Sequence, residues 1–152
     1  MIPSSFYPPE ANELTVLCRR VHNALNKHPK YLTKGKRAQL DWRAFGNSLG
    51  PHFFDFVKKS GNAFTLLEDP PRFLPSDGNW PIEKQPKIED AANLFARGVS
   101  QVRNNIEHAG KFLTEEEDQE KRRSLTLARE ALWVLKVAIE KHPDSKDLFA
   151  KF

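Results

Sequence analysis

Residues 86–110 read PKIEDAANLFARGVSQVRNNIEHAG, and their apolar side chains recur at three- and four-residue steps, as in an amphipathic helix. The apolar stripe consists of Phe95, Val99, Val102 and Ile106. Pro86 suits a first helical turn, the acids Glu89 and Asp90 suit the positive end of a helix dipole, and Gly110 is a favoured C-terminal cap. We therefore expect a helix that begins near residue 86 or 87 and ends at Gly110.

The same periodicity predicts helices on both sides of this stretch. After it, Thr114 to Glu117 form a capping box that opens a long helix, which Pro143 ends. Before it, residues 10–27 form a helix entered through Pro8 and Pro9, and residues 36–59 form a second. In that second helix, Gly46 and the pair Gly50-Pro51 predict a kink or a short break. Residues 144–152 could add a final short turn, in which Leu148 and Phe152 hold the chain end.

A proline-rich connector separates the second and third expected helices. Residues 60–86 contain five of the eleven prolines, together with Gly61, Gly78 and Asn79, so we expect no helix and no central strand there. Apolar residues are scattered through it: Phe64, Leu66, Leu67, Phe73, Leu74 and Trp80. Apolar anchors at this density predict that the connector folds back onto the helices.

These patterns predict one domain over residues 1–152, since 152 residues are a usual domain length. No internal repeat and no alternating strand pattern competes with the helices. The expected fold class is all-α, an antiparallel bundle of about four helices with the long Pro-rich loop between helices two and three.

Composition narrows the class of protein. The chain is 39% hydrophobic, yet no run is long enough to span a bilayer, so no membrane partner is expected. The N-terminus lacks the basic start and apolar stretch of a secretory signal, and we therefore expect a cytoplasmic protein. Cys18, the one cysteine, lies on the apolar stripe of the first helix and predicts a buried, inert thiol. Residues 1–60 hold ten Lys or Arg against four acids, a basic excess compatible with a phosphate-bearing partner.

Several site chemistries are excluded by residue type and spacing. One cysteine and five scattered histidines give no zinc cluster, and there is no Gly-rich phosphate loop and no serine in a nucleophile elbow. The acidic run from Glu115 to Asp118 occupies a first helical turn, where it stabilises the dipole instead of holding a metal. We expect neither a metal nor another cofactor.

One short run near the end of the third helix carries the residue types of a catalytic site: Arg103-Asn104-Asn105-Ile106-Glu107-His108. At about 100° per residue, with Phe95 at zero, Asn104 falls near 180° and His108 near 220°. Both therefore point away from the core of their own chain and share one face, while Arg103 lies on the flank. A second copy of the chain covering this face would turn it into a cleft.

This run resembles the signature of the HEPN superfamily (higher eukaryotes and prokaryotes nucleotide-binding), in which an arginine is followed after four to six residues by a histidine. Asn104 meets the family's preference for a polar residue directly after the arginine, and the order of the helices agrees. The nearest resemblance is to a branch of predicted ribonucleases that includes plasmid-encoded proteins. It implies a homodimeric, metal-independent endoribonuclease of a toxin or defence system, whose partners are RNA and an antitoxin or other inhibitor protein.

The resemblance also implies a role for each residue. His108 would act as acid or base, because imidazole exchanges protons near neutral pH. Arg103 would hold the scissile phosphate through parallel hydrogen bonds and stabilise its growing charge, and Asn104 would orient either group. Cleavage would proceed by attack of a ribose 2′-hydroxyl, which restricts the substrate to RNA.

Two other readings stay open. The chain could be a catalytically inactive helical module that binds RNA or dimerises, using the basic residues Arg19, Arg20, Lys34, Lys36 and Arg37. Alternatively, Arg103 and Glu107 form a solvated intrahelical ion pair, and His108 stabilises the C-terminal end of the helix dipole.

Overall fold

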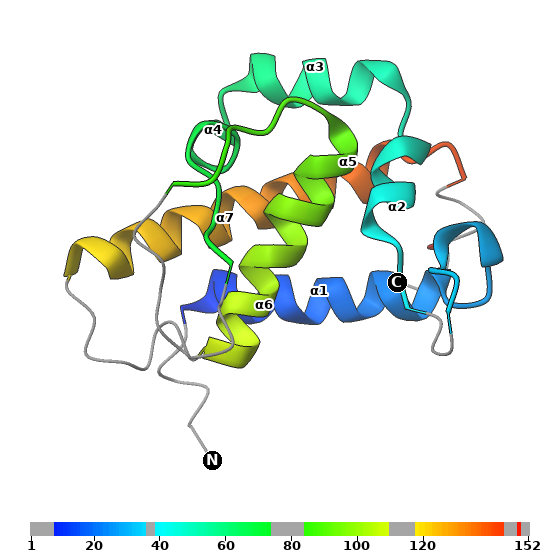
Figure 1. Cartoon of the computed structure of the whole chain (residues 1–152), viewed down its shortest axis with the longest axis horizontal. Helices are drawn as coiled ribbons and strands as arrows, with labels where there is room; N and C mark the ends of the chain where they lie inside the picture. The colour runs from blue at the N-terminus through cyan, green and yellow to red at the C-terminus, as the bar shows by residue number, and fades with distance from the viewer. Residues whose placement is uncertain (1–7, 36–38, 74–83, 110–117, 145–148, 150–152) are drawn as a thin grey trace.

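The computed structural model describes residues 8–35, 39–73, 84–109, 118–144 and 149, and of residues 108–109 and 118–121 only the backbone. Within this part the chain is helical, with an isolated bridge between Leu32 and Leu40 and no strand (Figure 1). The expected all-α class is confirmed. No helix of the described residues is both long and apolar enough to cross a membrane.

The helical elements follow in chain order. They are α1 (Pro9–Leu25), the 3-10 turn η2 (Pro29–Tyr31), α2 (Trp42–Ser48), α3 (Pro51–Ser60), α4 (Phe64–Glu68), α5 (Ala91–Asn93), the π-helical η3 (Leu94–Val99), α6 (Ser100–Ala109) and α7 (Asp118–Lys141). The last three elements before α7 join end to end, so residues 91–109 form one continuous helix.

The first helix matches its sequence pattern. Proline at its first position and Pro29 beyond its end bound α1, and its inward stripe is fully buried. That stripe consists of Ala11, Leu14, Cys18, Val21 and Leu25. The expected buried thiol is confirmed.

The second expected helix is two helices and begins later than residue 36. Leu40 lies in the bridge to Leu32, and the Asp41 carboxylate accepts hydrogen bonds from the backbone N–H groups of Arg43 and Ala44 at 3.0 and 3.1 Å, which starts α2 at Trp42. Gly50, with φ of 90°, then separates α2 from α3, a conformation that side-chain-bearing residues rarely adopt. The predicted break is confirmed there.

The connector holds a short helix that the proline count did not predict. Prolines begin at Pro70, so nothing prevents residues 64–68 from forming α4. From α7, the Glu130 Oε1 atom accepts the backbone N–H of Leu66 at 2.8 Å and caps this helix. Beyond it, Pro70 and Pro71 are buried, whereas residues 74–83 lie outside the described part.

The third helix begins at Ala91, later than expected, because Asp90 is its cap. The Asp90 Oδ1 atom accepts the backbone N–H of Asn93 at 2.8 Å. The helix then widens into the π-helical η3 before α6 continues as an ordinary α-helix. Gly98 lies within η3, where an added Cβ would approach the side chains of Ile88 and Leu66 closely.

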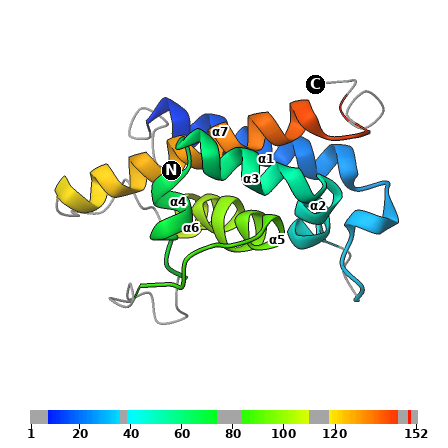
Figure 2. The same ribbon diagram turned by 90° about the horizontal axis from the view of Figure 1, so that it is seen from above.

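α1 and α7 pack against each other in parallel, so the expected antiparallel arrangement is wrong for this pair of helices. The Glu10 carboxylate pairs with Arg129 at 3.4 Å, and the Glu13 carboxylate pairs with Lys136 at 2.8 Å. Residue numbers therefore increase in the same direction along α1 and α7. Figures 1 and 2 show both helices running in the same direction, side by side. The helix of residues 91–109 crosses them steeply instead of returning alongside, which is why the last helix can point the same way as the first.

An aromatic core lies between α2, α3 and η3. Phe45 and Phe95 meet edge to face with ring centres 5.2 Å apart, and Trp42 stacks on Phe95 at 6.4 Å. Pro143 ends α7 just after Lys141, as predicted, and Phe149 is buried beyond it. The predicted capping box at Thr114 and the predicted end contacts of Leu148 and Phe152 fall outside the described residues.

Candidate functional site

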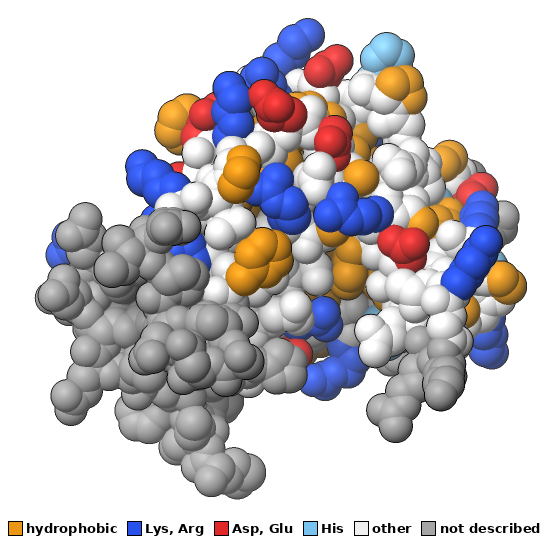
Figure 3. Space-filling model, in the orientation of Figure 1, with side chains coloured by type: hydrophobic (Ala, Val, Ile, Leu, Met, Phe, Trp, Pro, Cys, Tyr) orange, Lys and Arg blue, Asp and Glu red, His pale blue; other side chains and the backbone are white. Residues whose placement is uncertain are grey.

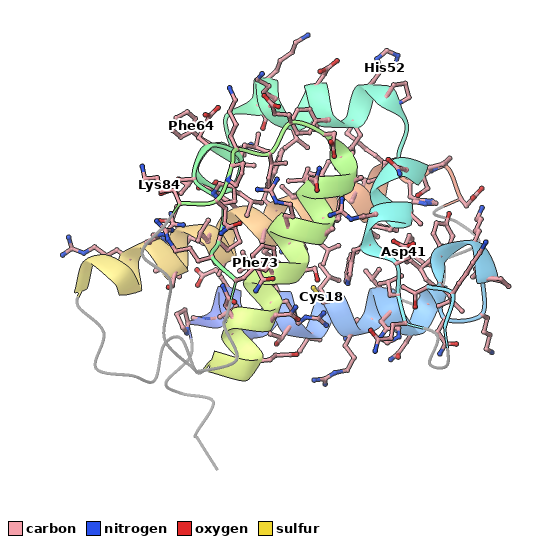
Figure 4. All side chains as sticks on the ribbon, in the orientation of Figure 1. Cys18, Asp41, His52, Phe64, Phe73 and Lys84 are labelled. Carbon is pink, nitrogen blue, oxygen red and sulfur yellow. The ribbon has the colours of Figure 1, made fainter. Side chains whose placement is uncertain are left out.

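The motif residues lie on α6, the half of the crossing helix that packs against α1. Val102 and Ile106 are buried, and they anchor the inner side of α6 in the core. Figure 4 shows Cys18 on α1 close to this crossing. Burial raises the pKa of the Cys18 thiol to about 12, and the charges of Arg103 and Glu107 act on the same thiol in opposite directions. Both charged side chains therefore lie beside α1.

Arg103 is engaged in an ion pair that is less solvated than the sequence predicted. Its Nε atom lies 4.0 Å from Oε2 of Glu107, and the two side chains are 23% and 32% exposed. That Nε atom is buried and has no hydrogen-bond partner among the described residues. The guanidinium thus presents only part of its surface outward, with a carboxylate beside it.

The other two motif residues are placed by the helix itself. Asn104 is half-buried on α6, and His108 lies in the last turn of α6, where its side chain is outside the described part. Along one helix, five residues correspond to a rise of about 7.5 Å and a rotation of about 140°. Arg103 and His108 of one chain therefore occupy different faces, and Asn104 and His108, four apart, share one.

Sequence reasoning missed a buried polar network directly beside this face. The Gln101 Nε2 atom donates to Oδ1 of Asn105 at 2.8 Å, and Asn105 Nδ2 donates to the backbone carbonyl of Arg72 at 3.0 Å. Gln101 and Asn105 are both 7% exposed. Their four-residue spacing next to the apolar stripe was a usable signal, but the partner thirty-three residues away was not.

A second part of this network fixes the same segment from α7. Arg123 donates to Oδ2 of Asp69 at 2.9 Å and to the backbone carbonyls of Asp69 and Pro70 at 3.0 and 2.9 Å. Arg72 lies 3.8 Å from the other oxygen of Asp69. Residues 69–72 are therefore tied to both α6 and α7, next to the motif.

One serine–histidine contact elsewhere resembles a catalytic pair but has the wrong proton arrangement. The Ser48 Oγ lies 2.8 Å from Nε2 of His142, yet Ser48 donates its own proton to the carbonyl of Phe45. Nδ1 of His142 accepts the backbone N–H of Asp144 at 3.1 Å, which leaves Nε2 as the protonated nitrogen. His142 therefore donates to Ser48 and cannot activate it, and the contact is structural.

The described residues contain no group of three or more His, Cys, Asp or Glu side chains that could hold a metal ion.

The surface also contains hollows that the motif does not line. A groove of about 540 Å³ between α1 and α7 is lined by Asn12, Glu13, Val16, Leu17, Arg20, Lys136 and Ile139. A second hollow, of about 370 Å³, lies between α2, α3 and the start of α5, with Asp55, Glu89 and Asp90 among its lining residues. Neither contains a residue of α6.

Comparison with known proteins gives no family to which the chain can be assigned. No family model, no curated protein and no solved structure matches it.

Proposed function

We propose that the protein is a metal-independent, HEPN-like endoribonuclease that acts as a homodimer. The observation that supports the proposal is that Arg103, Asn104 and His108 all lie on α6, with the partly buried Arg103 guanidinium 4.0 Å from Glu107. The Arg103 Nε atom is buried without a hydrogen-bond partner in the part of the chain that the structure describes, and a phosphate oxygen is an acceptor that a guanidinium N–H binds well. The proposed setting is a toxin or defence system in the cytoplasm, restrained by an antitoxin or other inhibitor protein.

The proposed reaction is transesterification within the RNA chain. One His108 removes the proton of a ribose 2′-hydroxyl, and the resulting oxygen forms a bond to the adjacent phosphorus. The bond from phosphorus to the 5′-oxygen breaks, and His108 of the second copy gives that oxygen a proton. Arg103 stabilises the charge on the non-bridging oxygens, and Asn104 orients either group. The products carry a 2′,3′-cyclic phosphate and a free 5′-hydroxyl.

The test is RNA cleavage in EDTA by the wild type, His108→Ala and Arg103→Ala. We expect each substitution to lower the rate at least a hundredfold, as is typical of general acid–base and phosphate-stabilising groups. His52→Ala, which changes an exposed histidine on α3, and Arg129→Ala, which changes an exposed arginine on α7, are the matched controls. RNA with 2′-O-methyl groups should not be cut, and light scattering should give twice the chain mass. Equal cleavage by all variants would refute the catalytic assignment.

One observation favours the second candidate, an inactive module that binds RNA or dimerises. Glu107 occupies one side of the Arg103 guanidinium, and a carboxylate there opposes a phosphate. In that case the exposed residues Arg19, Arg20 and Lys34 carry binding, while Lys36 and Arg37 lie outside the described part. Their replacement would then weaken RNA binding and flatten its salt dependence, and His108→Ala would change nothing.

A further inference from the structure

The groove of about 540 Å³ between α1 and α7 has an apolar lining that the proposed function does not use. Val16 is 44% exposed there, and Leu17 and Ile139 line the same groove at the edge of the core. One exposed valine is ordinary on a protein surface, whereas three apolar side chains in one hollow indicate a contact surface. Of the described residues that line the groove, none is aromatic, so it has no ring on which a nucleobase could stack.

The groove follows the two parallel helices that form its walls (Figure 2). On α1, the lining residues Glu13, Val16 and Arg20 are three and four positions apart and therefore share one face. On α7, Lys136 and Ile139 are three positions apart and also share a face. From Glu13 to Arg20 the helix rises by about 10 Å, or about two turns. A hollow of this length fits two turns of a third helix laid along it, which is how amphipathic helices bind in grooves.

The charges along the groove favour an acidic occupant. The carboxylate of Glu13 is matched within the chain, since it lies 2.8 Å from Nζ of Lys136. Arg20, at the other end, is exposed and has no ion-pair partner in the described part of the chain. Residues 14–40 contain seven Lys or Arg and no acid, and Figure 3 shows Lys and Arg groups at the lower edge of the molecule, where α1 runs in Figure 1. This end of the groove therefore attracts an acidic ligand and repels a basic one.

We propose that the groove binds an amphipathic helix of a partner protein, one that carries acidic residues beside its apolar stripe. Apolar side chains of that helix, three and four positions apart, lie on Val16, Leu17 and Ile139, and a Glu or Asp further along it pairs with Arg20. The apolar lining disfavours RNA, because a phosphate placed on it would leave water without a matching charge. No residue of α6 lines the groove, so this inference does not depend on the ribonuclease assignment.

The experiment uses a designed helical peptide as the partner. The probe is fluorescein-labelled and has leucines three and four positions apart with glutamates beside them, and a second peptide has lysines in place of the glutamates. Fluorescence anisotropy with the full chain gives both Kd values. We expect the glutamate peptide to bind and the lysine peptide to bind about tenfold more weakly. Val16→Asp should raise the Kd of the glutamate peptide about tenfold, because it places a carboxylate against the apolar stripe of the peptide.

Reversal of the charge at the other end of the groove is a second test. We expect Arg20→Glu to raise the Kd of the glutamate peptide about tenfold and to lower that of the lysine peptide by a similar factor. Arg19→Glu is the matched control, because it makes the same change of charge on a part of α1 that does not line the groove. Phe64→Asp is the control for Val16→Asp, since Phe64 is 67% exposed on α4 (Figure 4). Neither control should change a Kd by more than about twofold, and thermal melting verifies that each variant is folded.

The inference is refuted if neither peptide binds, or if Arg19→Glu weakens binding as much as Arg20→Glu does. It is also refuted if Val16→Asp weakens the binding of single-stranded RNA but not of the glutamate peptide, since the groove would then hold RNA. If Val16→Asp halves the mass found by light scattering, the groove is an interface between two copies of this chain, and the proposal falls as well. Cleavage of RNA in EDTA by the wild type tests the nuclease separately, and neither result decides the other.

Discussion

At the scale of single residues, the close contact between α2 and the start of α5 depends on Gly46. A Cβ built on this residue of α2 would overlap the backbone carbonyl oxygen and carbon of Ala91, at the start of α5. Backbone atoms of a helix cannot move aside as the end of a flexible side chain can. Alanine would raise helix propensity by about 1 kcal/mol, but the overlap costs about 1–3 kcal/mol or more.

We therefore expect Gly46→Ala to lower the free energy of unfolding by about 1–2 kcal/mol, because the overlap outweighs the gain in propensity. Urea denaturation measures the change. Gly35→Ala is the control, since nothing lies within 4 Å of its Cβ, and it should change stability little. A Gly46→Ala protein as stable as the wild type would show that α2 and α5 can separate without loss.

Glu107 is the second residue whose replacement is informative. Its carboxylate lies 4.0 Å from the Arg103 Nε atom, where it would compete with the phosphate of the proposed substrate. Under the proposed function we expect Glu107→Gln to lower KM about two- to fivefold, the effect of an ion pair of about 0.5–1 kcal/mol, with kcat little changed. Steady-state cleavage of single-stranded RNA gives both constants. A raised KM would mean that Glu107 positions Arg103 more than it competes with the substrate.

At the scale of helices, α4 depends on a side chain from α7. Glu130 accepts the backbone N–H of Leu66, and burial raises the pKa of its carboxyl group. We expect Glu130→Ala to cost about 1–3 kcal/mol, because the Leu66 N–H loses its partner in a buried place. Glu130→Gln keeps an acceptor oxygen and should cost less.

Hydrogen exchange at the Leu66 amide, together with urea denaturation, measures this effect. Glu140→Ala, an exposed change on the same helix, should leave both unchanged. Unaltered protection of Leu66 in Glu130→Ala would mean that α4 forms without its cap.

The helix of residues 91–109 shows where periodicity predicts well and where it does not. The stripe of Phe95, Val99, Val102 and Ile106 is buried, as predicted. The orientation of the polar residues on the other sides of this helix was less predictable. The wider turns of η3 rotate the residues that follow it around the helix axis, relative to the positions that a regular α-helix would give them. Gly98 was the one visible irregularity there, and a glycine within a helical pattern does not by itself indicate a π-helix.

At the scale of the whole molecule, local patterns predicted the long helices and the prolines that bound α1 and end α7, but they missed α4, placed the start of the third helix too early and did not predict how the helices assemble. The all-α class followed from three- and four-residue steps within each segment. The parallel course of α1 and α7, and the network from Arg123 to residues 69 and 70, depend on contacts between distant parts of the chain. No repeating pattern encodes such contacts, so the Arg103–His108 run was visible in the sequence and the contact of Asn105 with the backbone of Arg72 was not.

Global stability should depend on pH through His142, which joins the end of α7 to η2 and α2. The ring is 3% exposed, its Nε2 lies 3.1 Å from the Tyr31 hydroxyl, and its Nδ1 accepts the Asp144 N–H. Burial lowers the pKa of His142 below 6.5; nearby Asp144 acts to raise it and Lys30 to lower it further. The folded state therefore favours neutral imidazole, and the unfolded chain takes up the proton first as the pH falls.

We expect the free energy of unfolding to be constant above about pH 7 and to fall as the pH drops below about 6.5, the ordinary pKa of histidine, because the unfolded chain then binds the proton that the folded state excludes. Urea denaturation across this range measures it. His142→Gln should remove most of the decrease, whereas His52→Ala, at an exposed histidine, should retain it. An unchanged slope in His142→Gln would assign the effect to another group.

The shared direction of α1 and α7 gives the molecule an electrical polarity. Each helix carries about half an elementary charge of each sign at its two ends, and aligned dipoles add where opposed ones would cancel. α1 has 17 residues and α7 has 24, and the N-termini of both helices lie at the same end of the molecule, the end toward which α6 runs (Figure 1). The potential at that end is therefore more positive than an opposed pair would give, and the carboxylate of Glu10, in the first turn of α1, lies where this potential stabilises it.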